Sequence, residues 1–150
     1  MNLHKRVYTT LFSFKLKEQL KSPKKTYSHD TDMAKSVKFA LAHGTGKLME
    51  NIVAVELLRR GIEPYSCKTA NGKKVDFVIK KGNDIVELIQ ASYAISDYST
   101  KKRELSIITK AAEELKCDRL TVITRDYAGQ ESFKDKPIPF LPLWRWLLPD

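Results

Sequence analysis

The sequence predicts an α/β domain in which helices flank a mixed β-sheet. Residues 75–93 (VDFVIKKGNDIVELIQASY) contain two apolar runs around a Gly-Asn pair, a pattern typical of a β-hairpin. Segments 47–60 and 97–116, on either side of this hairpin, have helical spacing. Residues 119–124 (RLTVIT) form a β-branched run that the chain reaches through the second helix. Such a crossover predicts a strand parallel to its neighbour, and therefore a mixed sheet.

Composition indicates one domain over residues 1–150 and excludes several classes of protein. The 150 residues are 42% hydrophobic and 30% charged, which suits a soluble domain with a real core. No run of 18 apolar residues is present, so no transmembrane helix is expected. The basic N-terminus lacks the apolar core of a signal peptide. Cys67 and Cys117 are too few for a disulfide scaffold, so we expect a cytoplasmic protein.

Positive charge is concentrated near the N-terminus. The net charge is +9, and residues 1–50 hold much of the basic excess, including Lys21, Lys24 and Lys25 within a basic segment at 1–32. An excess at one end predicts DNA or an acidic protein as partner. The alternative is a lysine-rich surface without a specific partner.

The N-terminal third predicts two strands and a helix. Alternation over 8–16 is typical of an edge strand, and 25–29 suits a short strand. Asp30 or Asp32 can cap a helix through residue 41. The string GTGK at 44–47 lacks the first glycine and the hydroxyl of a phosphate-binding loop, so we expect a turn with Thr45 as N-cap.

The helix over 47–60 carries the first candidate site residue. It should end at Gly61, and Glu56 should pair with Arg60 one turn away. Glu50 faces apolar neighbours, namely Val53, Ala54 and Leu57. A buried carboxylate is costly unless it is paired or metal-bound. Glu50 is therefore either a site residue or a rim residue bonded to backbone.

The remaining elements follow in order. A strand over 62–69, turned back at Asn71-Gly72, should complete a three-stranded antiparallel meander with the 75–93 hairpin. Asp97 or Ser99 should cap the helix that ends near 116. We expect a charged loop at 125–136, then an edge segment framed by Pro137 and Pro139. A terminal helix at 142–148 follows, whose tryptophans either close the core or mark a docking surface.

Three polar residues interrupt the apolar runs of the 75–93 hairpin. Asp76 lies near the start of the first strand, and Gln90 and Ser92 lie two apart on one face of the second. An acid on one strand with two polar groups on the next is the layout of a metal-dependent phosphodiesterase site. Here the layout is chemically weakened, because two of its three groups are uncharged.

The order of elements and several strings carry a family resemblance. The strings are SPKKTYSHDTDM, GKLMENIVAVELLRRG, KTANGKKVDFVIKKG, VELIQASY and PLWRWLL. Between about residues 8 and 148 the chain resembles the PD-(D/E)XK restriction-endonuclease-like domain at the C-terminus of many archaeal and bacterial AAA-type ATPases. In that family the domain usually follows an ATPase module and a winged helix. Neither is present here, so the resemblance implies either a stand-alone relative or an excised piece, in which segment 1–32 would be a remnant of the winged-helix region. It implies no ATP hydrolysis by this chain.

The resemblance assigns roles to the polar residues. Glu50 falls at the acid on the helix and Asp76 at the first strand acid, whereas Gln90 replaces the second acid and Ser92 replaces the lysine. Mg²⁺ is usually held by carboxylates, so a site of Asp76 and Glu50 should bind it weakly. The missing lysine would have offset charge that develops in the transition state. Glu87, on the opposite face of its strand, is an alternative acid.

We therefore expect a nucleic-acid-associated nuclease-like domain that is weak or inactive as a nuclease. One alternative is a non-catalytic interaction module that docks on an ATPase, and another is an active Mg²⁺-dependent DNA nuclease that uses Asp76. The first turn of the helix over 97–116 contains Lys101, Lys102 and Arg103, whose positive charges oppose the helix dipole. Either a bound phosphate or ordinary solvation would reduce this unfavourable interaction. With Lys21, Lys24 and Lys25, these three cations are the expected nucleic-acid contacts.

Overall fold

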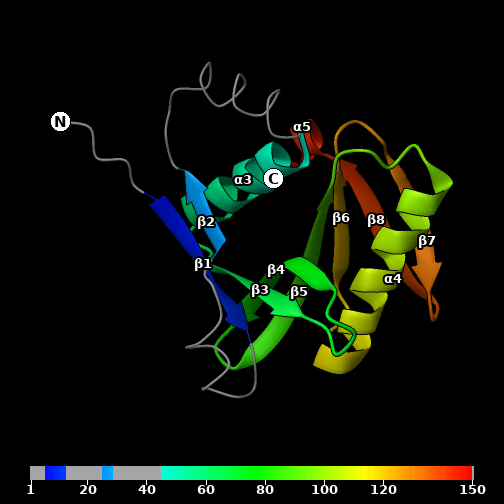
Figure 1. Ribbon diagram of the computed structural model, residues 1–150, viewed down its shortest axis with the longest axis horizontal. Helices are drawn as coiled ribbons and strands as arrows, with labels where there is room; N and C mark the ends of the chain where they lie inside the picture. The colour runs from blue at the N-terminus through cyan, green and yellow to red at the C-terminus, as the bar shows by residue number, and fades with distance from the viewer. Residues whose placement is uncertain (1–5, 13–24, 29–44, 150) are drawn as a thin grey trace.

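A computed structural model describes residues 6–12, 25–28 and 45–149 of the chain (Figure 1). Its strands are β1 (Arg6–Phe12), β2 (Lys25–Ser28), β3 (Pro64–Lys68), β4 (Lys74–Lys81), β5 (Asp84–Ser92), β6 (Leu120–Thr124), β7 (Gly129–Phe133) and β8 (Lys136–Pro142). Its helices are α3 (Thr45–Arg59), α4 (Tyr98–Leu115) and α5 (Leu143–Trp146). The described strands form one mixed sheet in the order β2-β1-β3-β4-β5-β6-β8-β7. The predicted α/β class with helices flanking a mixed sheet is confirmed.

The central sheet follows the sequence-based expectation. β3, β4 and β5 pair antiparallel as a meander, and β6 lies parallel to β5 after the crossover through α4. Gly72 adopts φ +77° in the first turn of the meander, and Gly61 adopts φ +74° just after α3. Both values lie in the left-handed region that glycine tolerates best, which explains the turn and the end of the helix.

The C-terminal part differs from the prediction. The expected loop at 125–136 contains β7, and the expected edge segment is β8, which lies inside the sheet between β6 and β7. The β7–β8 turn places Lys134 and Asp135 at φ 48° and 61°. Because neither residue is a glycine, the sequence lacked the usual pattern that predicts a hairpin turn. Pairing with β6 starts only at Phe140, beyond the two prolines, so their missing N–H groups do not interrupt that ladder.

The ends of the chain also differ from expectation. The first strand begins at Arg6 rather than at residue 8, and residues 13–16 of its expected range lie outside the described residues. The terminal helix α5 spans only Leu143–Trp146. Trp146 packs against the core, whereas Trp144 is 62% exposed. The helix expected after Asp30 or Asp32 lies outside the described residues.

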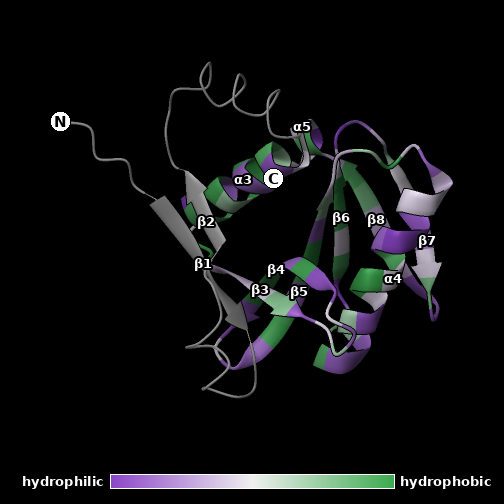
Figure 2. Ribbon diagram, viewed as in Figure 1, coloured by the Kyte–Doolittle hydropathy of each residue, from purple (hydrophilic) through white to green (hydrophobic). Residues whose placement is uncertain are grey.

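Two apolar layers cover the two faces of the sheet. The α4 layer packs Ile108 and Ala111 against Val78, Leu88 and other residues of β4, β5, β6 and β8. The α3 layer packs its helix against the alternate residues, among them Phe77, Ile89 and Ile123. Figure 1 shows α3 and α4 on either side of the central strands, and Figure 2 shows hydrophobic residues along these strands. No helix in the described ranges is long and apolar enough to cross a membrane.

Candidate polar site at the end of the central strands

A β-bulge places Asp76 at an irregular point of the sheet. β3 advances two residues from Tyr65 to Cys67, while β4 advances three between their partners, Val78 and Val75. One extra residue of β4 must therefore be accommodated beside Asp76. This bulge explains why Val75 and Val78, three residues apart, both join the α4 layer.

Side chains replace the backbone ladder where β4 and β5 part. The register between the two strands ends at the pair Phe77 and Ile89. One step further, the Asp76 N–H donates to Gln90 Oε1 at 3.2 Å. The Ala91 N–H donates to Asp76 Oδ2 at 3.1 Å. The structure thus brings Asp76 and Gln90 together.

A carboxylate from α4 completes the group. Gln90 Nε2 donates to Glu104 Oε2 at 2.9 Å, and Arg103 donates to Glu104 Oε1 through Nη2 at 2.8 Å and Nε at 3.2 Å. Asp76, Gln90 and Glu104 are only 5–6% exposed. We call Asp76, Gln90, Arg103 and Glu104 the polar cluster. Glu104 was not among the predicted site residues, although its place one turn before Ile107 and Ile108 puts it on the inner stripe of α4.

Ser92 lies near the polar cluster but is not bonded into it. It follows Gln90 by two residues on β5, is 6% exposed, and lies opposite Thr124 of β6. Its hydroxyl has no hydrogen bond to any described residue, whereas the Thr124 hydroxyl donates to Tyr127 O at 2.5 Å. A neutral hydroxyl thus occupies the position that the family resemblance assigns to a lysine.

The two other candidate acids lie apart from Glu104. Glu50 is half-buried on α3, and α3 packs on the face of the sheet opposite α4. Glu87 accepts a hydrogen bond from Thr121 Oγ1 at 2.7 Å and lies 3.5 Å from Arg119 Nε. These partners occupy Glu87 outside the polar cluster. The role of Glu50 beside Asp76 stays a prediction.

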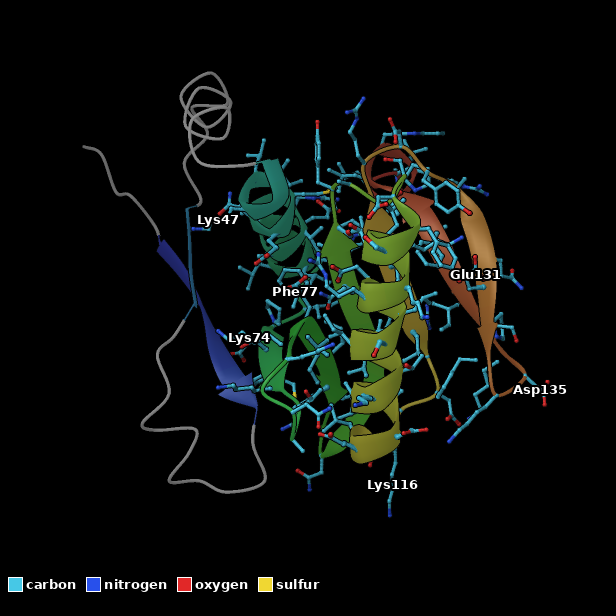
Figure 3. The ribbon with its side chains drawn as sticks, turned by 45° about the vertical axis from the view of Figure 1, so that its right-hand side comes forward. Lys47, Lys74, Phe77, Lys116, Glu131 and Asp135 are labelled. Atoms are coloured by element: carbon cyan, nitrogen blue, oxygen red, sulfur yellow. The ribbon has the colours of Figure 1, made fainter. Side chains whose placement is uncertain are left out.

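Two of the three cations at the start of α4 that were expected to contact phosphate, Lys101 and Arg103, instead form ion pairs within the protein. Lys101 forms an ion pair with Glu131 and contacts the Tyr127 hydroxyl at 3.2 Å, and its hydrogen bond to Glu131 raises its pKa. Figure 3 shows Glu131 beside the N-terminal part of α4. Arg103 is bound to Glu104, and Lys102 is exposed. Lys101 therefore joins α4 to β7. Lys21 and Lys24 lie outside the described residues, and Lys25 begins β2.

The described polar cluster does not fit a magnesium ion. Mg²⁺ prefers charged oxygen ligands in octahedral geometry. Both Glu104 oxygens and Gln90 Oε1 already accept hydrogen bonds, and Arg103 offsets the charge of Glu104. The described part of the chain holds no group of three or more His, Cys, Asp or Glu side chains arranged for a metal. As arranged, Gln90, Glu104 and Arg103 form a hydrogen-bond network in which both Glu104 oxygens are occupied.

Comparisons with known proteins place these residues in a wider context. A family described as "Domain of unknown function (DUF4143)" matches residues 45–146. An uncharacterised protein of Methanocaldococcus jannaschii is 33% identical over 147 residues, which cover 92% of this chain and 32% of that protein. The chain thus spans about a third of that relative's length. A chain in the structure of a Thermococcus gammatolerans McrB AAA+ hexamer assembly with bound McrC is 17% identical. The match has a TM-score of 0.46 and covers 66% of this chain and 27% of that one.

Proposed function

The chain belongs to the DUF4143 family of domains of unknown function, and from this premise we propose a more specific role. It is a PD-(D/E)XK nuclease-like domain, associated with nucleic acid, whose degenerate site has lost phosphodiester cleavage. The antiparallel meander, the parallel β6 and the bulge at Asp76 support the fold part of this proposal. The loss of cleavage is supported by the residues of the polar cluster.

The hydrogen bonds made by the Gln90 amide are the observation that supports the proposal most directly. A phosphodiesterase site needs charge to hold a metal, lower the pKa of its bound water and offset charge in the transition state. Gln90 adds no charge, and its two ends are bound to Asp76 N and Glu104 Oε2. Ser92 adds no cation. An amide spanning the site therefore stabilises the fold where two carboxylates and a lysine would perform catalysis.

We further propose that this domain works with an AAA-type ATPase. The proposal rests on the sequence resemblance and on the length of the archaeal relative. In that relative the matched region is 32% of the protein, so the domain is joined there to a longer polypeptide. Trp144, 62% exposed on α5, and Leu148, 55% exposed, offer an apolar contact to such a partner. Arg60 stacks at 4.5 Å over Trp146 and fixes this end of the chain.

Cleavage assays test the central claim. The wild type and Asp76→Ala should show equal, background cleavage of single-stranded, double-stranded and junction DNA in Mg²⁺ or Mn²⁺. Removal of one preorganised hydrogen-bond donor costs about 10²- to 10³-fold in rate in other enzymes, and two groups of comparable importance are absent here. Robust wild-type cleavage that Asp76→Ala abolishes would contradict the proposal.

A reconstruction gives the matched positive test. The triple variant Gln90→Glu, Ser92→Lys and Glu104→Gln restores an acid and a lysine. It also keeps a hydrogen-bond donor on α4 opposite the new carboxylate. Metal-dependent cleavage above background is expected from this variant and should disappear when Asp76→Ala is added. A folded triple variant that remains inactive would show that these positions are not a former catalytic register.

A further inference from the structure

The two turns of the central meander differ in charge. At the β4–β5 turn, Lys81 lies directly opposite Asp84, an attractive pair. At the β3–β4 turn, Lys68 lies directly opposite Lys74, and Lys73 precedes Lys74 in the chain. All three lysines of this turn are exposed. We call Lys68, Lys73 and Lys74 the lysine turn.

Directly opposed like charges destabilise a strand pair, because their Cβ atoms are only about 5 Å apart. The β7–β8 turn avoids this arrangement, since Lys134 pairs with Glu113 and Lys136 with Asp118. The lysine turn has no such carboxylate within 6–12, 25–28 and 45–149. Glu114 reaches the turn, but both of its oxygens accept from the Ala70 N–H, with N···O distances of 3.2 Å.

Two of the three lysines, Lys68 and Lys74, project away from α4. Cys67 and Val75 point into the α4 layer, so their neighbours Lys68 and Lys74 point to the other face of the sheet. Figure 3 shows Lys74 on the side away from α4, with Lys47 of α3 on the same side. Lys74 also precedes Asp76 by two residues on β4. Closely spaced cations thus lie beside the strand that carries the nuclease-like acid.

We propose that the lysine turn is a contact surface for the phosphate backbone of a nucleic acid. Phosphate oxygens would neutralise the opposed Lys68 and Lys74 ammonium groups, which no described side chain does. Such contacts carry no sequence information and release counterions when they form. This inference rests on the proposed function, because it locates the nucleic acid with which the inactive domain associates.

Two matched triple variants test the surface. The first changes Lys68, Lys73 and Lys74 to Gln, and the control changes Lys81, Lys134 and Lys136 to Gln, so each removes three positive charges. The probe is a labelled oligonucleotide of about 20 nucleotides, as single-stranded DNA, double-stranded DNA or RNA, with anisotropy read from about 50 to 200 mM KCl. We expect Kd to rise about 10-fold in the first variant and less than about 2-fold in the control. In the first variant only, the log–log salt slope should become shallower by about 0.9 for each lost phosphate contact on double-stranded DNA, up to about 2.7, and by about 0.7 for each on a single strand.

Several outcomes would contradict the proposal that the lysine turn contacts phosphate. These are no wild-type binding at low salt, equally weakened binding in both triple variants, or weakened binding only when Lys21, Lys24 and Lys25 are changed. Competition by poly-glutamate as strong as by unlabelled DNA would assign the lysine turn to an acidic protein instead. The first variant should melt no lower than the wild type, because it removes like-charge repulsion, and Lys74→Gln alone should give a smaller slope change. No wild-type binding at low salt would also overturn the proposed association with nucleic acid. The other outcomes would overturn the lysine turn alone, and none of them bears on the loss of cleavage.

Discussion

Two buried glutamates, one on each flanking helix, are satisfied in different ways. Glu56 of α3 is 8% exposed and accepts from Arg59 and Arg60 at 2.7–2.8 Å, both on its own helix. Glu104 of α4 is 5% exposed and accepts from Arg103 on its own helix and also from Gln90, which belongs to a strand. The Glu56 group is therefore local in the chain, and the Glu104 group joins α4 to the sheet.

The comparison shows which contact holds the tertiary structure at the candidate site. The guanidinium of Arg59, with that of Arg60, lowers the pKa of Glu56 to about 2. These partners remain beside Glu56 wherever α3 packs. The amide of Gln90 meets Glu104 only when α4 lies on the sheet and β5 is in register with β4. Substitutions of Gln90 should therefore disturb the packing of α4 on the sheet, whereas substitutions of Glu56 should affect only the stability of α3.

The largest effect is expected from Gln90→Glu. It places a second carboxylate against Glu104 in a buried position, so the free energy of unfolding should fall by roughly 3 kcal/mol at neutral pH. Like charges raise each other's pKa, so the variant should regain stability as the pH falls. Urea unfolding between pH 4 and 7 measures both. The double variant Gln90→Glu with Glu104→Gln should recover most of the stability, since it restores a donor and acceptor pair; no recovery would mean that this contact does not hold α4.

The opposite pH response is expected at Glu56. A folded-state pKa of about 2, against 4.5 for an ordinary glutamate, contributes stability above about pH 4.5 that is lost as the pH falls toward 2. Glu56→Gln should cost about 1 to 2 kcal/mol near neutrality, and wild type and variant should converge at low pH. Thermal unfolding at matched pH values checks this. A constant difference across the range would show that the carboxylate charge is not responsible.

The smallest effect is expected from Arg103→Ala. The Arg103 side chain is 61% exposed, so its ion pair with Glu104 should contribute less than about 1 kcal/mol. A destabilisation as large as that of Gln90→Glu would mean that the ion pair of Arg103 with Glu104, and not the hydrogen bond of Gln90 with Glu104, is the critical contact. Chemical unfolding of Arg103→Ala beside Gln90→Glu makes the distinction, and Lys102→Ala, one residue away, serves as the exposed control.

Local features of the sequence predicted most of the secondary structure. The Gly-Asn and Asn-Gly turns predicted the meander, Gly61 predicted the end of α3, and Asp97 caps α4 by accepting from the Thr100 N–H. The pairing of Glu56 with Arg60 is also confirmed. Each of these rests on residues within a few positions of one another, where backbone geometry alone decides which groups meet.

The sequence by itself determined the class of the fold, the order of its central elements and the uncharged side chains at positions 90 and 92. Only the tertiary structure decided that β8 lies inside the sheet, that Lys101 meets Glu131, and that Glu104 reaches Gln90. A local pattern predicts which face of a helix or strand is apolar. It does not predict which polar group of another element will meet a polar residue, such as Glu104, that lies on that face. That choice depends on strand register and helix placement, which arise from packing across the whole sheet.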